Sequence, residues 1–261
     1  RRLSYFTRKT YQTHGRCFVL KCDIQQFFPS IDHSILLGLI SKRIQDPDAL
    51  WLVRTIIESF CVNPVLIERE RRGCPIGNLT SQLFANIYLN ELDQFIKKTL
   101  MVKYYIRYTD DFVIVDKDQA HLLILKNKIK DFLKNSLKME LHPHKVHIRK
   151  YSQGIDFLGY MVLPKWRVLR TKTKRRITRK LKLRVAQFKQ GIIPENTLIQ
   201  SIASYFAVLS HANSYLLKQS LQDIVFASPR ILPQEWDKRK KGADRVRSLP
   251  VDTILVDEFP W

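Results

Sequence analysis

Cysteine is scarce in this chain of 261 residues, and the spacing of its cysteines argues against a zinc site and against a disulfide framework. The four cysteines are Cys17, Cys22, Cys61 and Cys74, and they form neither a C-x-x-C pair nor a paired cysteine and histidine motif of the zinc-site kind. Zinc sites and disulfide frameworks are recognised by such spacings. We therefore expect four reduced thiols.

Long apolar runs and targeting segments are also missing. No run approaches the roughly 20 apolar residues of a membrane-spanning helix, no signal peptide opens the chain, and no internal repeat is found. These absences predict a soluble, cytoplasmic protein without a membrane partner.

Acidic residues are few relative to basic ones. The chain has 45 Lys and Arg against 24 Asp and Glu, which gives a formal net charge of +21. So large an excess of cations destabilises a compact chain unless a polyanion is a normal partner. Nucleic acid is the first candidate for that partner.

The apolar patterns alternate between strand-like and helix-like runs. Residues 18–24 and 104–115 read as a strand and a hairpin, the latter with acids at its turn. Strands are also expected near 146–149 and 157–161, and helices over 32–44, 49–60, a stretch that includes 84–95, and 119–137. This order predicts an α+β fold, a split βαβ unit with helices on one face of an antiparallel sheet.

The composition changes abruptly at residue 166. Residues 166–190 contain eleven Lys or Arg and no acid, with Ile177, Leu181, Val185 and Phe188 on one helical face. A solvated charged face is the ordinary explanation, but the missing acids favour a surface that binds a nucleic-acid backbone. We expect one domain over 1–165, a helical domain over 166–226 and a tail over 227–261 of unknown role.

Three aspartates are candidates for metal-assisted chemistry. Phosphoryl transfer from a nucleoside triphosphate requires two divalent cations a few ångströms apart, and carboxylates hold them. Asp23 lies near the end of a predicted strand, while Asp110 and Asp111 occupy a predicted turn. Aspartates at turns are common for backbone hydrogen-bonding reasons alone, so the pattern around them decides between the two interpretations.

That pattern resembles the palm motifs of bacterial reverse transcriptases. The segments are DIQQFFPSIDH at 23–33, PIGNLTSQ at 75–82 and YTDD at 108–111, while Lys145 and FLGY at 157–160 resemble the next two motifs. The resemblance implies a right-hand polymerase with a palm, a basic helical thumb and fingers that are present only in part, because the residues that hold the triphosphate would precede Arg1.

Carried over residue by residue, the resemblance assigns the metal site to Asp23, Ile24, Asp110 and Asp111. The two principal ligands are Asp23 and Asp110, and Asp111 is the supporting acid. Two Mg²⁺ ions are expected, with Mn²⁺ as an alternative cofactor.

The nucleotide site implied by the resemblance has more members. Phe28 resembles the steric gate that excludes a ribose 2′-hydroxyl, and its alternative is a core aromatic, a role that Phe27 also fits. Gly77 would let the backbone approach the nucleotide, or it simply enters a helix. Lys145 resembles the lysine near the leaving pyrophosphate, or it is a solvated surface residue. Members of the site are Ile24, Phe28, Ile76, Gly77, Gln82 and Lys145.

Two departures from the common motifs favour a subtype. Ile76 and Gln82 stand where most bacterial enzymes have Gln and Pro, which resembles the error-prone enzymes of diversity-generating retroelements. The implied partners are template RNA, a cDNA or primer strand, dNTPs and a small basic accessory protein, in a bacterial or phage-infected cell. Alternatives are a phage-defence, retron or group II intron enzyme, and a non-catalytic RNA-binding protein.

Overall fold

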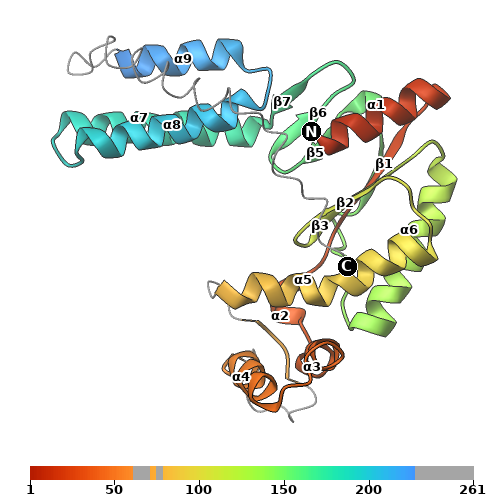
Figure 1. The fold of residues 1–261 in the computed structure, drawn as a ribbon. Helices are drawn as coiled ribbons and strands as arrows, with labels where there is room; N and C mark the ends of the chain where they lie inside the picture. The colour runs from red at the N-terminus through yellow and green to blue at the C-terminus, as the bar shows by residue number, and fades with distance from the viewer. Residues whose placement is uncertain (61–70, 75–78, 227–261) are drawn as a thin grey trace. The chain divides into compact units, whose positions relative to one another are not determined.

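The computed structural model describes residues 1–60, 71–74 and 79–226, which divide into two compact units. The first unit comprises Arg1–Phe157 and Val162–Lys165. The second comprises Leu158–Met161 and the chain from Trp166 onward (Figure 1).

The first unit is built on a four-stranded antiparallel sheet with the order β2-β3-β1-β4. β1 lies inside this sheet, paired with β3 on one side and β4 on the other. Its strands are β1 (Phe18–Asp23), β2 (Tyr105–Tyr108), β3 (Asp111–Asp116) and β4 (His147–Lys150).

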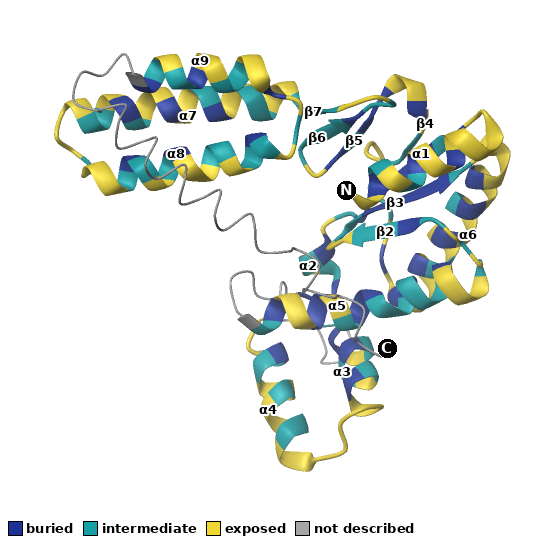
Figure 2. Ribbon diagram, turned by 45° about the horizontal axis from the view of Figure 1, so that its top comes forward, coloured by how far each residue is buried: buried dark blue, intermediate teal, exposed yellow. Residues whose placement is uncertain are grey.

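The strands at the centre of the sheet are buried, because helices cover both of its faces (Figure 2). On one face, Leu20 and Ile114 join the main core with residues of α5 and α6. On the other, Val19 and Val113 join a second core with Leu3 of α1. The helices of this unit are α1 (Arg2–His14), α2 (Phe27–Ser30), α3 (His33–Ser41), α4 (Pro47–Glu58), α5 (Leu79–Gln94) and α6 (Gln119–Leu137).

Short polar side chains start three of these helices. Asp32, Asp46 and Asp118 are the N-caps of α3, α4 and α6, and their carboxylates accept hydrogen bonds from backbone N–H groups in the first turn. Such caps stabilise a helix by about 0.5–2 kcal/mol each. α6 ends at Lys138 in the left-handed conformation, with a φ of 49°. The capping residues therefore explain where the helices begin more directly than the apolar pattern does.

The second unit contains three described helices, α7 (Thr171–Lys189), α8 (Glu195–Ser210) and α9 (Tyr215–Phe226). α7 packs against both others. Ile177, Leu181 and Val185 of α7 are buried in their shared core, as the apolar spacing predicts, and Phe188 packs against it. The cations of α7 are left on its remaining surface.

A three-stranded sheet with the order β5-β6-β7 follows β4 along the chain. β5 (Ile155–Phe157) and β6 (Tyr160–Val162) are joined by Leu158 and Gly159, whose φ values are 51° and 82°. Positive φ at both central residues is typical of a type I′ hairpin turn. β7 (Arg167–Leu169) lies where the sequence predicted only a basic helix.

Two features of the first unit differ from the expectations. The helix α1 was not predicted, and it packs against β3 on the face away from α6, so helices cover both faces of the sheet and not one. Its apolar residues are interleaved with cations and hydroxyl side chains, and the buried Thr7 and Thr10 do not read as a core face. The first strand, the hairpin and α6 lie within one residue of the predicted ranges, whereas the strand expected near 157–161 contains the turn between β5 and β6.

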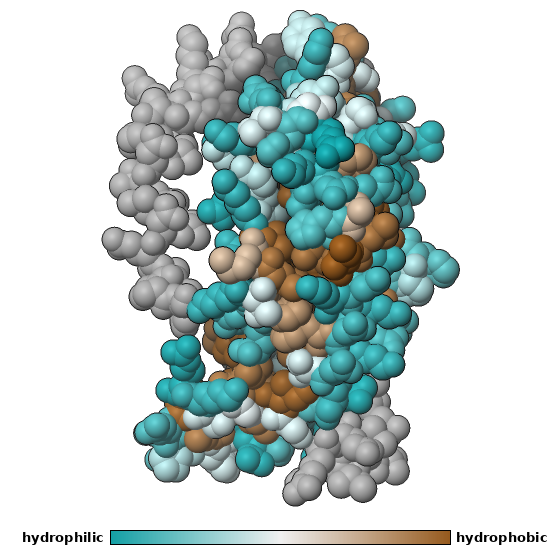
Figure 3. Space-filling model, turned by 90° about the vertical axis from the view of Figure 1, so that its right-hand side faces the viewer, coloured by the Kyte–Doolittle hydropathy of each residue, from teal (hydrophilic) through white to brown (hydrophobic). Residues whose placement is uncertain are grey.

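The surface combines hydrophilic and apolar side chains. Figure 3 shows an apolar band through the middle of one face, with hydrophilic side chains around it. On α6, Leu122 and Leu125 are buried whereas Leu123 and Ile124 are exposed. Four consecutive apolar residues span more than one full turn of a helix, so some of them must face solvent. Among the described residues, no helix combines the length and the hydropathy that crossing a membrane would need.

Burial of the described cysteines has a chemical consequence that can be measured. Cys17, Cys22 and Cys74 are free and buried. Burial raises the pKa of Cys17 to about 12 and also raises the pKa values of Cys22 and Cys74. A pKa near 12 leaves about 10⁻⁴ of the thiol as thiolate at pH 8, and the thiolate is the reactive form. We therefore expect iodoacetamide to label Cys17 about 10³-fold more slowly than a free cysteine.

Mass spectrometry of the peptides that carry Cys17 and Cys22 measures this labelling, with protein unfolded in guanidinium as the control. Rapid alkylation of Cys17 in native buffer would contradict the described burial.

Candidate active site

The register of two strands brings acidic residues together. β1 and β3 pair in antiparallel fashion, and the pairing places Asp23, the last residue of β1, directly opposite Asp111, the first residue of β3. Asp110 precedes β3 in the hairpin turn and is partly exposed. The hairpin of β2 and β3 thus pairs beside β1 through β3.

Strand alternation puts the charged groups on a single face of the sheet. Residues directly opposite each other in a strand pair share a face, as do residues two apart on one strand. Lys21, Asp23 and Asp111 therefore share the face on which Val19 and Val113 are buried. The other face of β1 carries Leu20 and Cys22, which belong to the main core, and Phe18, which packs against it.

Two lysines compensate the carboxylates. The ammonium of Lys145 lies 3.2 Å from both carboxylate oxygens of Asp23, and its side chain is 55% exposed. The ammonium of Lys21 lies 3.6 Å from Oδ1 of Asp111, with a side chain that is only 11% exposed. Lys145 therefore contacts Asp23 while most of its side chain stays in solvent, and its role near a pyrophosphate stays a prediction.

Asp111 is the acid whose titration is most affected by this environment. Burial raises its pKa, the nearby Asp23 and Asp110 raise it further, and Lys21 opposes the shift. Its Oδ1 atom is buried without a hydrogen bond, since the contact with Lys21 is long for one. An orphaned carboxylate oxygen beside two further carboxylates is a donor set that suits Mg²⁺, which prefers oxygen ligands.

The described side chains do not by themselves form a closed metal cage. Within residues 1–60, 71–74 and 79–226, no group of three or more His, Cys, Asp or Glu side chains is arranged to hold a metal ion. The register brings the three aspartates into one region, and the assignment of individual ligands stays a prediction.

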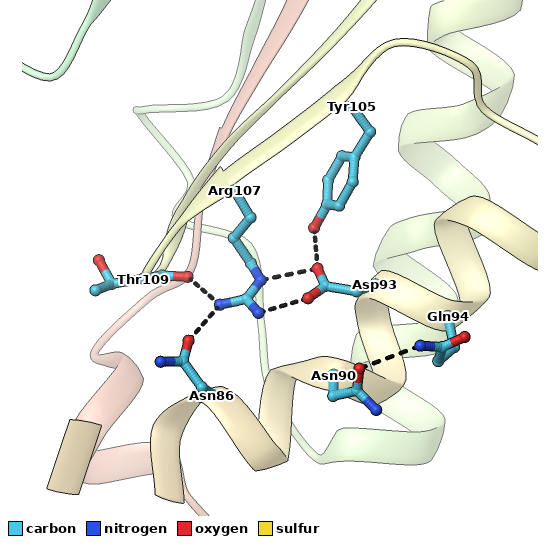
Figure 4. Close-up of polar contacts among 7 residues, drawn as sticks. All are labelled: Asn86, Asn90, Asp93, Gln94, Tyr105, Arg107 and Thr109. Carbon is cyan, nitrogen blue, oxygen red and sulfur yellow. Dashed lines mark hydrogen bonds and ion pairs between the residues drawn. The ribbon is translucent and has the colours of Figure 1, made fainter. Parts of the chain in front are cut away.

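The turn that carries Asp110 has an unusual backbone. Thr109 has a φ of 53°, in the left-handed region that non-glycine residues seldom occupy. Its Oγ1 lies 2.8 Å from Oδ1 of Asp110 and 2.7 Å from the carbonyl oxygen of Tyr108, and its single proton can serve only one of them at a time. Arg107 donates to the carbonyl oxygen of Thr109 at 3.1 Å (Figure 4).

Phe28 lies at the edge of the main core, after the chain turns out of β1. Gln26 takes up the left-handed conformation and starts α2, in which Phe27 is buried and Phe28 is partly buried. The two rings lie 5.2 Å apart. The carbonyl oxygen of Phe28 accepts a hydrogen bond of 3.0 Å from the N–H of Cys74. This bond joins the predicted steric gate to the segment that leads toward the predicted nucleotide loop.

The remaining predicted residues lie in three different situations. Ile76 and Gly77 fall outside the described residues. Gln82 is exposed in the first half of α5. Ile24 is 1% exposed with its side chain in the main core, so a ligand could meet only its backbone.

Sequence reasoning missed Lys21 and Arg107, although a signal for both was available. Each is a cation that interrupts an apolar strand. Lys21 lies two residues before Asp23, and Arg107 lies two residues before Thr109, the first residue of the turn. Buried cations are rare unless they are paired. A lone cation in a strand that leads to a candidate acid therefore indicates a supporting ion pair.

The arrangement defines a class of protein. An antiparallel sheet with acids on two adjacent central strands, helices on both of its faces and a separate basic helical unit is the right-hand polymerase fold. More narrowly, the chain belongs to the reverse transcriptase (RNA-dependent DNA polymerase) family, whose sequence profile matches residues 2–162.

Individual relatives share about a quarter of their residues with this chain over the matched region. Protein YkfC of Escherichia coli (strain K12) is 25% identical, over 59% of this chain and 49% of its own length. The group II intron-encoded protein LtrA of Lactococcus lactis subsp. cremoris is 27% identical, over 56% of this chain and 35% of its own. The matched region thus spans about half or less of these relatives.

Solved structures agree on the fold. A telomerase from Candida albicans, in complex with a TWJ fragment of telomeric RNA, covers 93% of this chain with a TM-score of 0.55 and 12% identity, over 45% of its own length. An apo telomerase from Candida tropicalis covers 86% with a TM-score of 0.51, over 49% of its own length. The predicted α+β polymerase fold is thereby confirmed.

Proposed function

We propose that the protein is an RNA-directed DNA polymerase that synthesises cDNA on an RNA template from dNTPs. The observation that carries the proposal is the register that sets Asp23 opposite Asp111, with Lys145 3.2 Å from Asp23, in a chain of the reverse transcriptase family. Asp23, Asp110, Asp111 and the backbone of Ile24 would hold two Mg²⁺ ions. When bound, such ions stabilise the charge on the attacking and leaving oxygens of phosphoryl transfer.

The chain's own side chains have separate tasks in this proposal. Lys145 supplies a half-exposed cation beside Asp23, where it can meet a leaving pyrophosphate. Phe28 limits the space beside the nucleotide sugar. The cations of α7 bind the phosphate backbone of the template and primer.

Primer extension tests the proposal. The full-length protein is given a labelled DNA primer on an RNA template, with dNTPs and Mg²⁺, and is compared with the Asp110→Asn variant. Extension by the parent and its loss in the variant are expected. Tight RNA binding without any extension by the parent would instead favour a non-catalytic RNA-binding protein.

Phe28 offers a prediction about sugar selection. We expect Phe28→Val to raise incorporation of rNTPs relative to dNTPs by about 10–100-fold, because one group in an apolar pocket is worth about 1–3 kcal/mol of discrimination. Single-nucleotide incorporation kinetics with dNTP and rNTP measure the ratio. The neighbouring Phe27→Leu is the matched control, since its buried ring should affect stability and not sugar choice. An unchanged ratio in Phe28→Val would remove the gate assignment.

For the subtype, we propose the error-prone enzyme of a diversity-generating retroelement, working with a structured template RNA and a small basic accessory protein. Ile76 and Gln82 support this assignment through the resemblance of their motifs. A Gln at position 76 could hydrogen-bond to the nascent pair, whereas Ile76 can only pack against it, which gives looser selection. Sequenced products of Ile76→Gln should then show fewer errors opposite adenine than products of the parent.

The similarity to LtrA favours a second candidate, an intron-type reverse transcriptase. Product sequencing separates the two candidates. Errors concentrated opposite adenine in the parent support the retroelement enzyme, while faithful copying supports the intron-type enzyme or a retron or defence enzyme.

A further inference from the structure

A largely buried arginine connects α5 to the turn that carries Asp110 (Figure 4). The side chain of Arg107 on β2 is only 11% exposed. Its Nε donates to Oδ1 of Asp93 at 2.8 Å and its Nη2 donates to Oδ2 at 2.5 Å. Its Nη1 donates to Oδ1 of Asn86 at 3.2 Å and to the carbonyl oxygen of Thr109 at 3.1 Å. Four N–H groups of one guanidinium are therefore engaged.

Helix and strand periodicity explain why these groups meet. Asn86 and Asp93 are seven residues apart on α5, which places them two turns apart on the same helical face. Tyr105 and Arg107 are two residues apart on β2 and share a face of the sheet. The hydroxyl of Tyr105 donates to Oδ1 of Asp93 at 2.6 Å, so Asp93 is held from two positions of the strand.

The cluster lies behind the candidate site. Arg107 is opposite Phe112 in the sheet, on the face of the main core, whereas Asp111 belongs to the other face with Asp23. Arg107 therefore cannot act on the carboxylates directly. It reaches the site through the backbone, at the carbonyl of Thr109.

This backbone contact falls where the chain needs support. A non-glycine residue in the left-handed region costs on the order of 1 kcal/mol or more and persists only when its surroundings hold it. Thr109 is such a residue, and its carbonyl belongs to the peptide that leads into Asp110. Fixing that peptide plane fixes the direction in which the Asp110 side chain leaves the backbone.

Arg107 stays positively charged beside Asp93. Burial alone would lower the pKa of Arg107, but the hydrogen bonds and attraction of Asp93 raise it above its ordinary value. A bidentate pair between arginine and a carboxylate also fixes geometry, because the planar guanidinium matches the two oxygens. A lysine offers one point charge and cannot reproduce these contacts together.

We propose that Arg107, held by Asp93 and Asn86 of α5, is a positioning residue that orients Asp110 through the Thr109 carbonyl. The proposal rests on the proposed function, in which Asp110 is a metal ligand. It couples the catalytic turn to the helix that begins directly after the predicted nucleotide loop.

Arg107→Lys tests the proposal in the full-length protein. The measurement is the pre-steady-state burst of single-nucleotide incorporation, whose amplitude counts active molecules and whose rate reports the positioned chemical step. We expect the burst rate to fall about 10–100-fold, as for a displacement of about 1 Å at the reacting groups, with the amplitude and the primer-template Kd unchanged within threefold. Arg54→Lys is the matched control, because Arg54 is 61% exposed in an i,i+4 pair with Glu58.

A second readout does not depend on polymerase activity. Mn²⁺ binding to the protein without nucleic acid, followed by electron paramagnetic resonance, should weaken about 10-fold or more in Arg107→Lys. A variant with parental burst rate and parental Mn²⁺ affinity overturns the proposal, and so does a variant that loses only amplitude. If the parent binds Mn²⁺ but does not extend primers, the proposed function is wrong. The Mn²⁺ affinities of the parent and of Arg107→Lys then still decide the role of Arg107.

Discussion

Asp23→Asn is expected to lower the rate of primer extension by about 10³-fold or more, which corresponds to about 4 kcal/mol of transition-state stabilisation. Asp23 faces Asp111 across the strand pair and is 8% exposed. An amide of the same shape keeps the packing but removes the negative charge that would hold a cation. The rate is measured by single-nucleotide incorporation at saturating Mg²⁺.

The fold should survive this change. Lys145 is more than half exposed, so water can replace its partner, and we expect the free energy of unfolding to change by less than about 1 kcal/mol. Asp131→Asn, an exposed position on α6, is the control that should retain activity. An Asp23→Asn variant that is folded and extends primers at the parental rate would refute the metal-ligand assignment.

Neutralising one side of α7 is expected to produce the second large effect. Lys172, Arg175, Arg176 and Arg179 are exposed on the side of α7 away from its buried Ile177. Changing all four to Gln keeps helix-forming side chains. If each cation contacts one phosphate of a duplex, the slope of log K against log salt becomes shallower by about 3.6 and affinity falls about 10²-fold or more at low salt.

Fluorescence anisotropy with a labelled primer-template over a salt series measures both quantities. A variant with the same loss of charge elsewhere, Lys97, Lys98, Lys128 and Lys130 to Gln, is the control for net charge, because these lysines are exposed on other helices and segments. Equal losses in both variants would mean that α7 contributes only to the overall positive field of the protein.

Much of the first unit could be predicted from the sequence, because its central strands have a clear strand-like pattern. Residues 18–24 and 104–115 are apolar and β-branched runs bounded by turn residues, and a two-residue turn leaves one simple pairing for the hairpin. The candidate acids followed from where those runs end. The basic helix could likewise be predicted, since its apolar seam has a period of 3.6 and its charges have one sign.

The supporting contacts could not be predicted, because they depend on the packing of elements distant in the chain. Arg107 meets Asp93 only once α5 lies behind β2, and Lys145 meets Asp23 across 122 residues. Nothing near Asp93 in the sequence distinguishes it from a solvated acid at the end of a helix. The helix α1 was missed because two of its buried positions are threonines, Thr7 and Thr10, of which Thr7 donates its hydroxyl within the helix to the carbonyl oxygen of Leu3.

The alternation along β1 also restricts which length changes this chain can accept. Inserting one residue directly after Val19 would exchange the faces of the rest of the strand. Leu20 and Cys22 would then leave the main core, and Lys21 and Asp23 would enter it without partners, at a cost of several kcal/mol for each buried charge. Stability and the candidate site would be lost in the same event, so we expect this chain to tolerate length changes in its loops and not within this strand.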